Sequence, residues 1–172
     1  MSSKNDKFYL KLALNLAKQH EGLTNENPSV GCVIVKDNKI LSLSKTSISG
    51  RPHAEDNAIR FANTNDLKGS TIYVTLEPCT HHGKTPPCTD LIIKKKISKI
   101  VYASNDIDER TANKLKKVLK NHNISTKQIR MKEITDFYKS YFFIRKNKFP
   151  YITAKLALSL IHISEPTRRV FI

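Results

Sequence analysis

Hydrophobic residues recur at the start of the chain with the spacing of one helix face. Tyr9, Ala13 and Ala17 lie four residues apart, which predicts an amphipathic helix over residues 5–20. The pattern then changes to short runs of β-branched and aliphatic residues at 30–35 and 40–43. The Asp-Asn pair between these two runs favours a turn, so we expect a hairpin.

After the hairpin, the expected helices and strands alternate. They are a helix with Pro52 in its first turn, a strand at 71–75, a helix at 88–96, a strand at 97–103, a helix at 111–120, a weak strand at 124–131 and a helix at 133–145. This alternation predicts an α/β fold with three layers, α/β/α, around a mixed sheet of about five strands. One more strand is expected to begin at Pro150, as the start of a second domain.

The length and the composition narrow the class of protein. A chain of 172 residues with 39% hydrophobic residues suits one domain, or one domain and a fragment of another. No apolar run approaches the ~20 residues that a membrane span needs, and the N-terminus lacks the apolar core of a signal peptide. Three cysteines cannot form a disulfide framework, and their odd number favours a reducing compartment. We therefore expect a cytoplasmic protein with no membrane partner.

The positive charge leaves three interpretations open. Lys and Arg total 30 against 15 Asp and Glu, so the net charge is +15 and the isoelectric point is about 9.8. This excess is consistent with compositional bias, with an anionic small substrate or with nucleic acid. The basic residues are spread along the chain, so their distribution does not choose among the three.

One group of His, Glu and Cys residues has the pattern of a catalytic metal site. His53 and Glu55 lie at the predicted start of a helix, and Cys79 and Cys88 follow downstream, the first directly after a proline. One His and two Cys can supply three ligands to a tetrahedral zinc ion and leave the fourth position for water. Glu55, two residues after the His, is placed to move a proton of that water, and the H-x-E…P-C…C pattern is a zinc-deaminase signature. The third cysteine, Cys32, lies in an apolar strand and is interpreted as a core residue.

The segment from Thr75 to Cys88 closely resembles the motif of the riboflavin-biosynthesis pyrimidine deaminase, the N-terminal half of a bifunctional deaminase/reductase with a cytidine-deaminase-like fold. The resemblance includes the segments 27–35, 52–55 and 148–156. The eight residues between Cys79 and Cys88 are its most specific feature, because nucleoside and polynucleotide deaminases carry a Cys-x-x-Cys spacing instead.

The resemblance implies the substrate and several contacts. The substrate would be the diaminopyrimidinone that carries a ribosylamino 5′-phosphate, and Glu55 would deliver the proton that lets ammonia leave. Asn27 and Ala54 are expected to hold the pyrimidine ring or the ribose, and His81 and Lys84 to contact the substrate from the inserted loop. We leave open whether the protein forms a homo-oligomer.

The chain also departs from the family pattern. Asp108 stands where the family has an amide, which puts a carboxylate near a phosphorylated ligand, and Glu26 stands where proline is usual. We expect the deaminase domain to span residues 1–147, the start of a truncated reductase domain 148–157, and an adapter-like, non-native tail 158–172. NADPH would serve only that missing reductase domain, because no Gly-rich phosphate loop occurs among the five isolated glycines.

Two other functions compete with this interpretation. A nucleic-acid deaminase of the tRNA-adenosine type would explain the charge, but the long spacing between the cysteines argues against it. A non-catalytic zinc module would need a fourth protein ligand, for which Cys32 is the one candidate; a sulfur ~2.3 Å from the metal would favour that interpretation.

Overall fold

The structure is a computed structural model that describes residues 3–62, 67–83, 85–108, 111–112 and 114–155. Its elements are α1 (Ser3–Lys18), β1 (Gly31–Lys36), β2 (Lys39–Lys45), the 3₁₀ helix η1 (Ile48–Gly50), α2 (Ala54–Phe61), β3 (Thr71–Leu76), α3 (Cys88–Lys94), β4 (Lys99–Ser104), α4 (Leu115–Leu119), the 3₁₀ helix η3 (Lys120–His122), β5 (Ser125–Gln128), α5 (Lys132–Phe137) and α6 (Lys139–Asn147).

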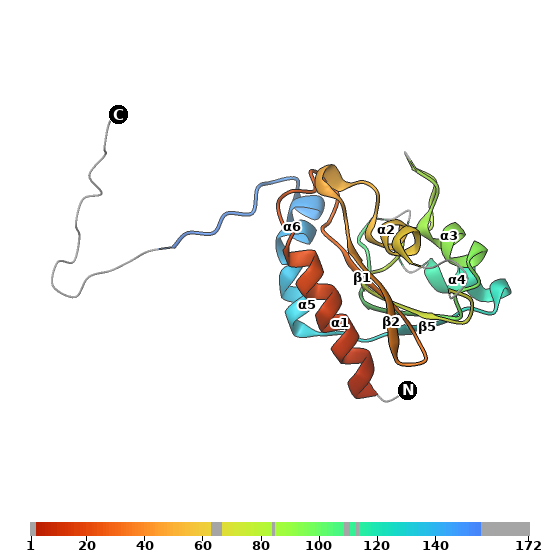
Figure 1. Cartoon of the computed structure of the whole chain (residues 1–172). Coiled ribbons are helices and arrows are strands. Elements are labelled where there is room, and N and C mark those ends of the chain that lie inside the picture. The colour runs from red at the N-terminus through yellow and green to blue at the C-terminus, as the bar shows by residue number, and fades with distance from the viewer. Residues whose placement is uncertain (1–2, 63–66, 84, 109–110, 113, 156–172) are drawn as a thin grey trace, which may run out of the picture.

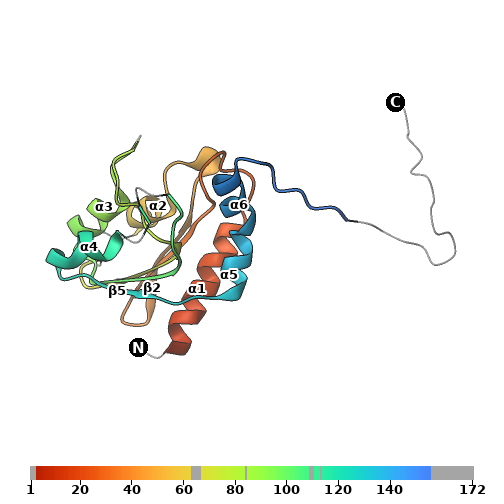
Figure 2. The same ribbon diagram turned by 180° about the vertical axis from the view of Figure 1, so that it is seen from behind.

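The five strands form one mixed sheet in the order β2-β1-β3-β4-β5. The hairpin strands β1 and β2 are antiparallel, β1 is antiparallel to β3, and β3, β4 and β5 run parallel. Figure 1 and the reverse view in Figure 2 show α1, α5 and α6 on one side of the sheet and α2, α3 and α4 on the other. The predicted three-layer α/β/α fold with a five-stranded mixed sheet is therefore confirmed.

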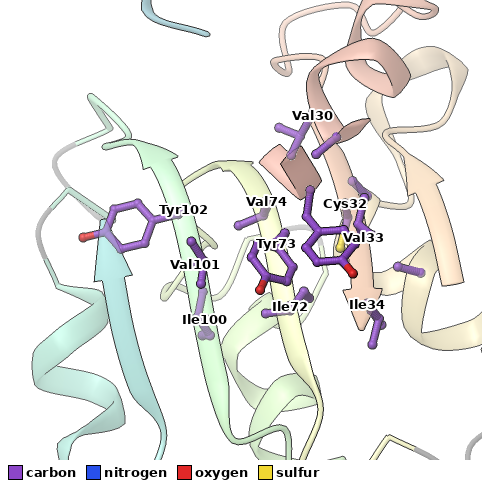
Figure 3. Packing of buried hydrophobic residues seen from close by; sticks show 14 of the residues in the cluster. Val30, Cys32, Val33, Ile34, Ile72, Tyr73, Val74, Ile100, Val101 and Tyr102 are labelled. Atoms are coloured by element: carbon purple, nitrogen blue, oxygen red, sulfur yellow. The ribbon is translucent and has the colours of Figure 1, made fainter. Parts of the chain in front are cut away.

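The core lies on both faces of the central strands. All six residues of β3 are buried, as expected for a strand covered on both sides, and the side chains of Ile72, Tyr73 and Val74 pack between neighbouring strands and helices (Figure 3). Helix α1 approaches β1 so closely that a Cβ atom added to Gly31 would lie 1.8 Å from the carbonyl oxygen of Ala13. Only glycine fits this contact without a backbone shift.

Three expectations about secondary structure are wrong in detail. The helix expected at 133–145 is two helices, α5 and α6, separated by Tyr138, whose backbone has φ −86° and ψ 0° and whose side chain is buried against the sheet. Pro52 precedes α2 rather than lying in its first turn, because His53 occupies the N-cap position with extended φ and ψ. Residues 151–155 are exposed and form no strand, since no strand of the described sheet pairs with them.

The expected division of the C-terminal region is not tested by these elements. Helix α6 ends at Asn147, next to the boundary expected for the deaminase domain. The expected tail at 158–172, together with residues 156 and 157, lies outside the described residues.

Candidate metal centre and active site

The site lies where the chain leaves the carboxyl end of β3 and meets the first turn of α2. Strand β3 ends at Leu76, and the next residues lead through Pro78 to Cys79. His53 is the N-cap of α2 and Glu55 is in its first turn, whereas Cys88 is the first residue of α3. Three separate elements thus present these side chains to one point, and the carboxyl ends of parallel strands are the usual place for a site in a sheet of this kind.

The three predicted metal ligands converge. The ligand atoms of His53, Cys79 and Cys88 all lie within 4.8 Å of one another. His53 Nδ1 is 3.7 Å from Cys79 Sγ and 3.4 Å from Cys88 Sγ. Tetrahedral zinc with ordinary Zn–S and Zn–N lengths separates such a pair of ligand atoms by about 3.5 Å. The donor set and its spacing therefore fit zinc.

Hydrogen bonds hold the two cysteines together although eight residues separate them. The Cys88 backbone N–H donates to Cys79 Sγ over 3.2 Å, and both the N–H and the hydroxyl of Thr89 donate to the Cys79 carbonyl oxygen over 3.3 Å. The first turn of α3 thereby closes the inserted loop onto its own start. A long insertion can consequently have the same ligand geometry as a short one.

The surroundings favour a thiolate at Cys79. A hydrogen bond from the Cys88 thiol is the largest influence on this pair, and it lowers the pKa of Cys79 to about 4 while raising the pKa of Cys88. The hydrogen bond with Cys79 raises the pKa of the His53 imidazole. Since thiolate is the form that binds metal, Cys79 already favours the ligating state, whereas Cys88 and His53 would release a proton when a metal ion binds.

Glu55 is held beside the cluster in an environment suited to proton transfer. Its side chain is buried at 4% exposure, and this desolvation raises its pKa to about 7 against the opposing charge of His53. A carboxyl group whose pKa lies near neutrality can both accept and donate a proton at physiological pH.

The other residues expected to contact the substrate are placed differently from one another. Asn27 and His81 line the same pocket as His53, Glu55 and Cys79. The Asn27 side chain donates to the Gly50 carbonyl oxygen over 3.1 Å, and His81 Nδ1 lies 2.9 Å from the Thr111 hydroxyl. These bonds fix both side chains at the pocket wall.

Ala54 and Lys84 are not part of that described wall. The Ala54 side chain is fully buried in the core at the start of α2, so a ligand contact there would use its backbone. Lys84 lies outside the described residues. Substrate contacts by both residues stay predictions.

Three of the pocket residues, Arg51, Tyr141 and Arg145, were not anticipated from the sequence. Arg51 lines the pocket beside the metal cluster. Glu77 also lines it, and its carboxylate accepts from the Leu115 N–H over 3.3 Å. Helix α6 adds Tyr141 and Arg145. The only signal for this pair in the sequence was their i, i+4 spacing.

Cys32 behaves as a core residue. It is fully buried in β1, and burial raises its pKa. Within the described residues it is not part of the cluster formed by His53, Cys79 and Cys88. The arrangement of three ligands with a buried carboxyl group beside them is typical of catalytic zinc sites rather than structural ones.

Comparison with known proteins gives the same class. Residues 3–104 match the family model described as the cytidine and deoxycytidylate deaminase zinc-binding region. The matched segment contains the four residues of the metal cluster and its neighbouring carboxyl group.

Individual relatives indicate a narrower group of deaminases than the family model does. The chain is 42% identical over 147 residues to a diaminohydroxyphosphoribosylamino-pyrimidine deaminase of Buchnera aphidicola, covering 85% of this chain and 99% of that protein. It is 43% identical over 156 residues to the riboflavin biosynthesis protein RibD of Aquifex aeolicus, covering 90% of this chain and 44% of that protein. A solved structure of Acinetobacter baumannii RibD superposes with a TM-score of 0.82 at 36% identity, covering 92% of this chain and 45% of that one.

These findings show the family. The chain belongs to the zinc-binding cytidine and deoxycytidylate deaminases, in the branch formed by RibD and the diaminohydroxyphosphoribosylamino-pyrimidine deaminases. It spans less than half the length of the RibD relatives that it matches. No helix in the described part of the chain is long and apolar enough to cross a membrane.

Proposed function

We propose that the chain is a zinc-dependent hydrolase that deaminates the diaminopyrimidinone carrying a ribosylamino 5′-phosphate, in riboflavin biosynthesis. The observation that carries the proposal is the convergence of His53, Cys79 and Cys88 beside the buried carboxyl group of Glu55. The similarity over nearly the full length of a dedicated pyrimidine deaminase supports this choice of substrate.

His53, Cys79 and Cys88 would hold the zinc ion. When bound, zinc lowers the pKa of water toward ~7 and so supplies a nucleophile at neutral pH. Glu55 accepts a proton from the attacking water on a carboxylate oxygen and delivers it to the exocyclic nitrogen. The carbon–nitrogen bond then breaks and ammonia leaves. The ring carbon keeps the oxygen of the water as a carbonyl, and the second proton of that water ends on the neighbouring ring nitrogen.

The pocket walls would orient the ring during this exchange. Asn27 and His81 present polar groups that are already fixed by hydrogen bonds to Gly50 and Thr111. Leu76 and Val30 supply apolar surface on the same pocket. A flat heterocycle is suited to a site with a few fixed polar groups and an apolar wall.

A direct assay tests the proposal. The zinc-loaded chain is incubated in parallel with the phosphorylated diaminopyrimidinone and with cytidine, and ammonia is measured. We expect ammonia from the first substrate only, and its release should stop after treatment with a chelator and return when zinc is added. Release from cytidine alone would assign the chain to nucleoside deamination instead.

Three further proposals concern the location of the protein, its partners and the reductase step. We propose that the protein acts in the cytoplasm, without a nucleic-acid partner, and that the reductase step with NADPH belongs to a domain that residues 148–157 only begin. These statements rest on the composition and on the resemblance to the bifunctional family. Supplying the deaminated product and NADPH to the 172-residue chain, and following the nicotinamide absorbance, tests the assignment of the reductase step.

A further inference from the structure

The pocket at the metal cluster opens beside a second depression on the same side of the molecule. This adjoining hollow shares Asp108, Tyr141 and Arg145 with the metal-site pocket, and Lys146 and Lys148 extend it along α6. The three shared residues form a rim between the two depressions.

The sizes of the two depressions imply that one ligand uses both. The metal-site pocket has a volume of about 100 Å³, whereas the adjoining hollow has about 740 Å³. One water occupies ~30 Å³, so the metal-site pocket has the volume of a few water molecules. Pockets that hold a whole ligand usually measure ~300–1,000 Å³. A pyrimidine ring at the metal would therefore place its ribosyl phosphate beyond the rim.

The charges that line the two depressions also favour a phosphate group in the adjoining hollow. The metal-site pocket contains four carboxyl groups, those of Glu55, Glu77, Asp106 and Asp108, against the guanidinium groups of Arg51 and Arg145. The adjoining hollow contains one carboxyl group, that of Asp108, against three cations on or next to α6. A phosphate dianion is repelled by the first environment and attracted by the second.

Arg145 is held at the rim in a defined position. Its guanidinium carbon lies 5.7 Å from the centre of the Tyr141 ring, and its Nη2 donates to the Glu26 carbonyl oxygen over 3.1 Å. A guanidinium has five N–H donors in a planar fork that matches phosphate, so these contacts leave donors for a ligand. Arg51, in contrast, acts electrostatically on His53 and donates to the Thr85 hydroxyl, so its contacts lie at the metal cluster and the loop beside it and not at α6.

We propose that Arg145 binds the phosphate group of the substrate at the rim, with Lys146 and Lys148 adding positive charge in the adjoining hollow, so that α6 determines specificity for the phosphorylated pyrimidine. The inference rests on the proposed function. It assigns this role to residues that lie outside the family-matched segment 3–104. The shared segment would thus supply the reaction, and α6 the selection of the substrate.

The experiment compares two substrates that differ only in the phosphate. Ammonia release by the zinc-loaded chain and by its Arg145→Gln variant is measured with the phosphorylated pyrimidine and with its dephosphorylated form. We expect Arg145→Gln to raise KM for the phosphorylated substrate about 10- to 100-fold, the effect of one charge-assisted hydrogen bond, with kcat nearly unchanged. Its kcat/KM for the dephosphorylated form should stay within about twofold of wild type.

Two control variants separate this role from a structural one. Lys139→Gln removes the same charge from an exposed position of α6 outside both depressions, and should leave both substrates unaffected. Arg145→Lys keeps the charge and should restore part of the lost affinity. In wild type, the preference for the phosphorylated substrate should fall as salt is added, and this fall should be weaker in Arg145→Gln.

The outcomes distinguish the inference from the function on which it rests. If wild type deaminates the phosphorylated substrate and Arg145→Gln does so equally well, the phosphate binds elsewhere and the inference is wrong. Equal losses with both substrates would make Arg145 a structural residue and also overturn it. If wild type releases no ammonia from either substrate, the proposed function fails, and the inference fails with it.

Discussion

At the scale of single residues, the site depends on side chains whose roles follow from burial. Among the described residues, Glu55 is one of three buried carboxyl groups, with Asp6 and Glu77. The charge of His53 only partly offsets the effect of burial on the pKa of Glu55. Burial of this kind is costly, and it is tolerated where the group performs chemistry.

The Glu55→Gln variant tests the proton transfer. The amide keeps the shape of the side chain and cannot exchange the proton, so we expect zinc binding to be retained and ammonia release to fall at least ~10²–10⁴-fold. Zinc content and turnover are measured on the same preparation. Activity near that of wild type would remove Glu55 from the mechanism, and loss of zinc would make its role structural.

The three cysteines provide an internal comparison for the metal site. Cys88→Ser removes a soft ligand from the cluster, and we expect zinc to fall from about one ion per chain to a small fraction of that. Cys32→Ala changes a cysteine of the core that lies outside the cluster, so zinc content should not change. Metal analysis of both proteins after dialysis checks this prediction. Equal loss from both variants would mean that Cys32 also holds the metal.

At the scale of elements, one buried carboxylate ties α1 to the sheet. Asp6 is fully buried and accepts hydrogen bonds from Tyr73 in β3 over 2.9 Å and from Lys127 in β5 over 2.7 Å, and Lys99 in β4 lies 4.0 Å away. Burial alone would raise the pKa of Asp6, but these hydrogen bonds and charges lower it below the ordinary value of 3.8. A helix is thus joined to three parallel strands through one side chain.

The lowered pKa of Asp6 predicts that the stability of the fold depends on pH. Because the pKa is lower in the folded state than in the unfolded state, the stabilisation is present above about pH 4 and is lost as the pH falls through the folded value. Asp6→Asn should lower the free energy of unfolding at pH 7 by about 1–3 kcal/mol, and the difference from wild type should shrink below about pH 4. Urea unfolding at a series of pH values measures this.

An exposed ion pair supplies the matched control for Asp6. Asp136 pairs with Lys132 over 2.6 Å on the surface of α5, where solvent screens the attraction. Asp136→Asn should therefore leave the unfolding curve unchanged at every pH. A pH-independent loss of stability in Asp6→Asn would contradict the linkage argument.

At the scale of the whole molecule, the excess of positive charge raises the question of nucleic acid. The net charge of +15 attracts any polyanion, so weak binding to RNA at low salt is expected whatever the substrate. Such binding depends on the release of counterions and weakens steeply with added salt.

The dependence on salt therefore distinguishes non-specific binding of RNA from deamination of RNA. We expect binding to a single-stranded RNA to disappear as salt rises from about 50 to 200 mM, and no base of that RNA to be deaminated, whereas ammonia release from the phosphorylated pyrimidine continues. Filter binding and base analysis measure the two effects. Conversion of adenine or cytosine in the RNA would favour the nucleic-acid alternative.

The sequence by itself determined the features that depend on local pattern. Apolar periodicity identified α1 and the order of strands and helices, and the spacing of His53, Glu55, Cys79 and Cys88 identified a candidate zinc site. Ligand identity is a property of side-chain chemistry, so it can be recognised in one dimension. The resemblance of the segment around Cys79 to a family of pyrimidine deaminases added the proposed substrate class.

Only the tertiary structure decided which distant residues complete the pocket. Tyr138 breaks the expected last helix because its buried hydroxyl donates to the Ser29 carbonyl oxygen and lies 2.6 Å from the Thr75 hydroxyl, contacts that no local pattern contains. The second helix that results, α6, brings Arg145 to the rim of a pocket whose candidate metal ligands, His53, Cys79 and Cys88, lie far earlier in the chain. Helix periodicity can identify an apolar or a polar face, but the partner of that face is set by how the layers pack against the sheet.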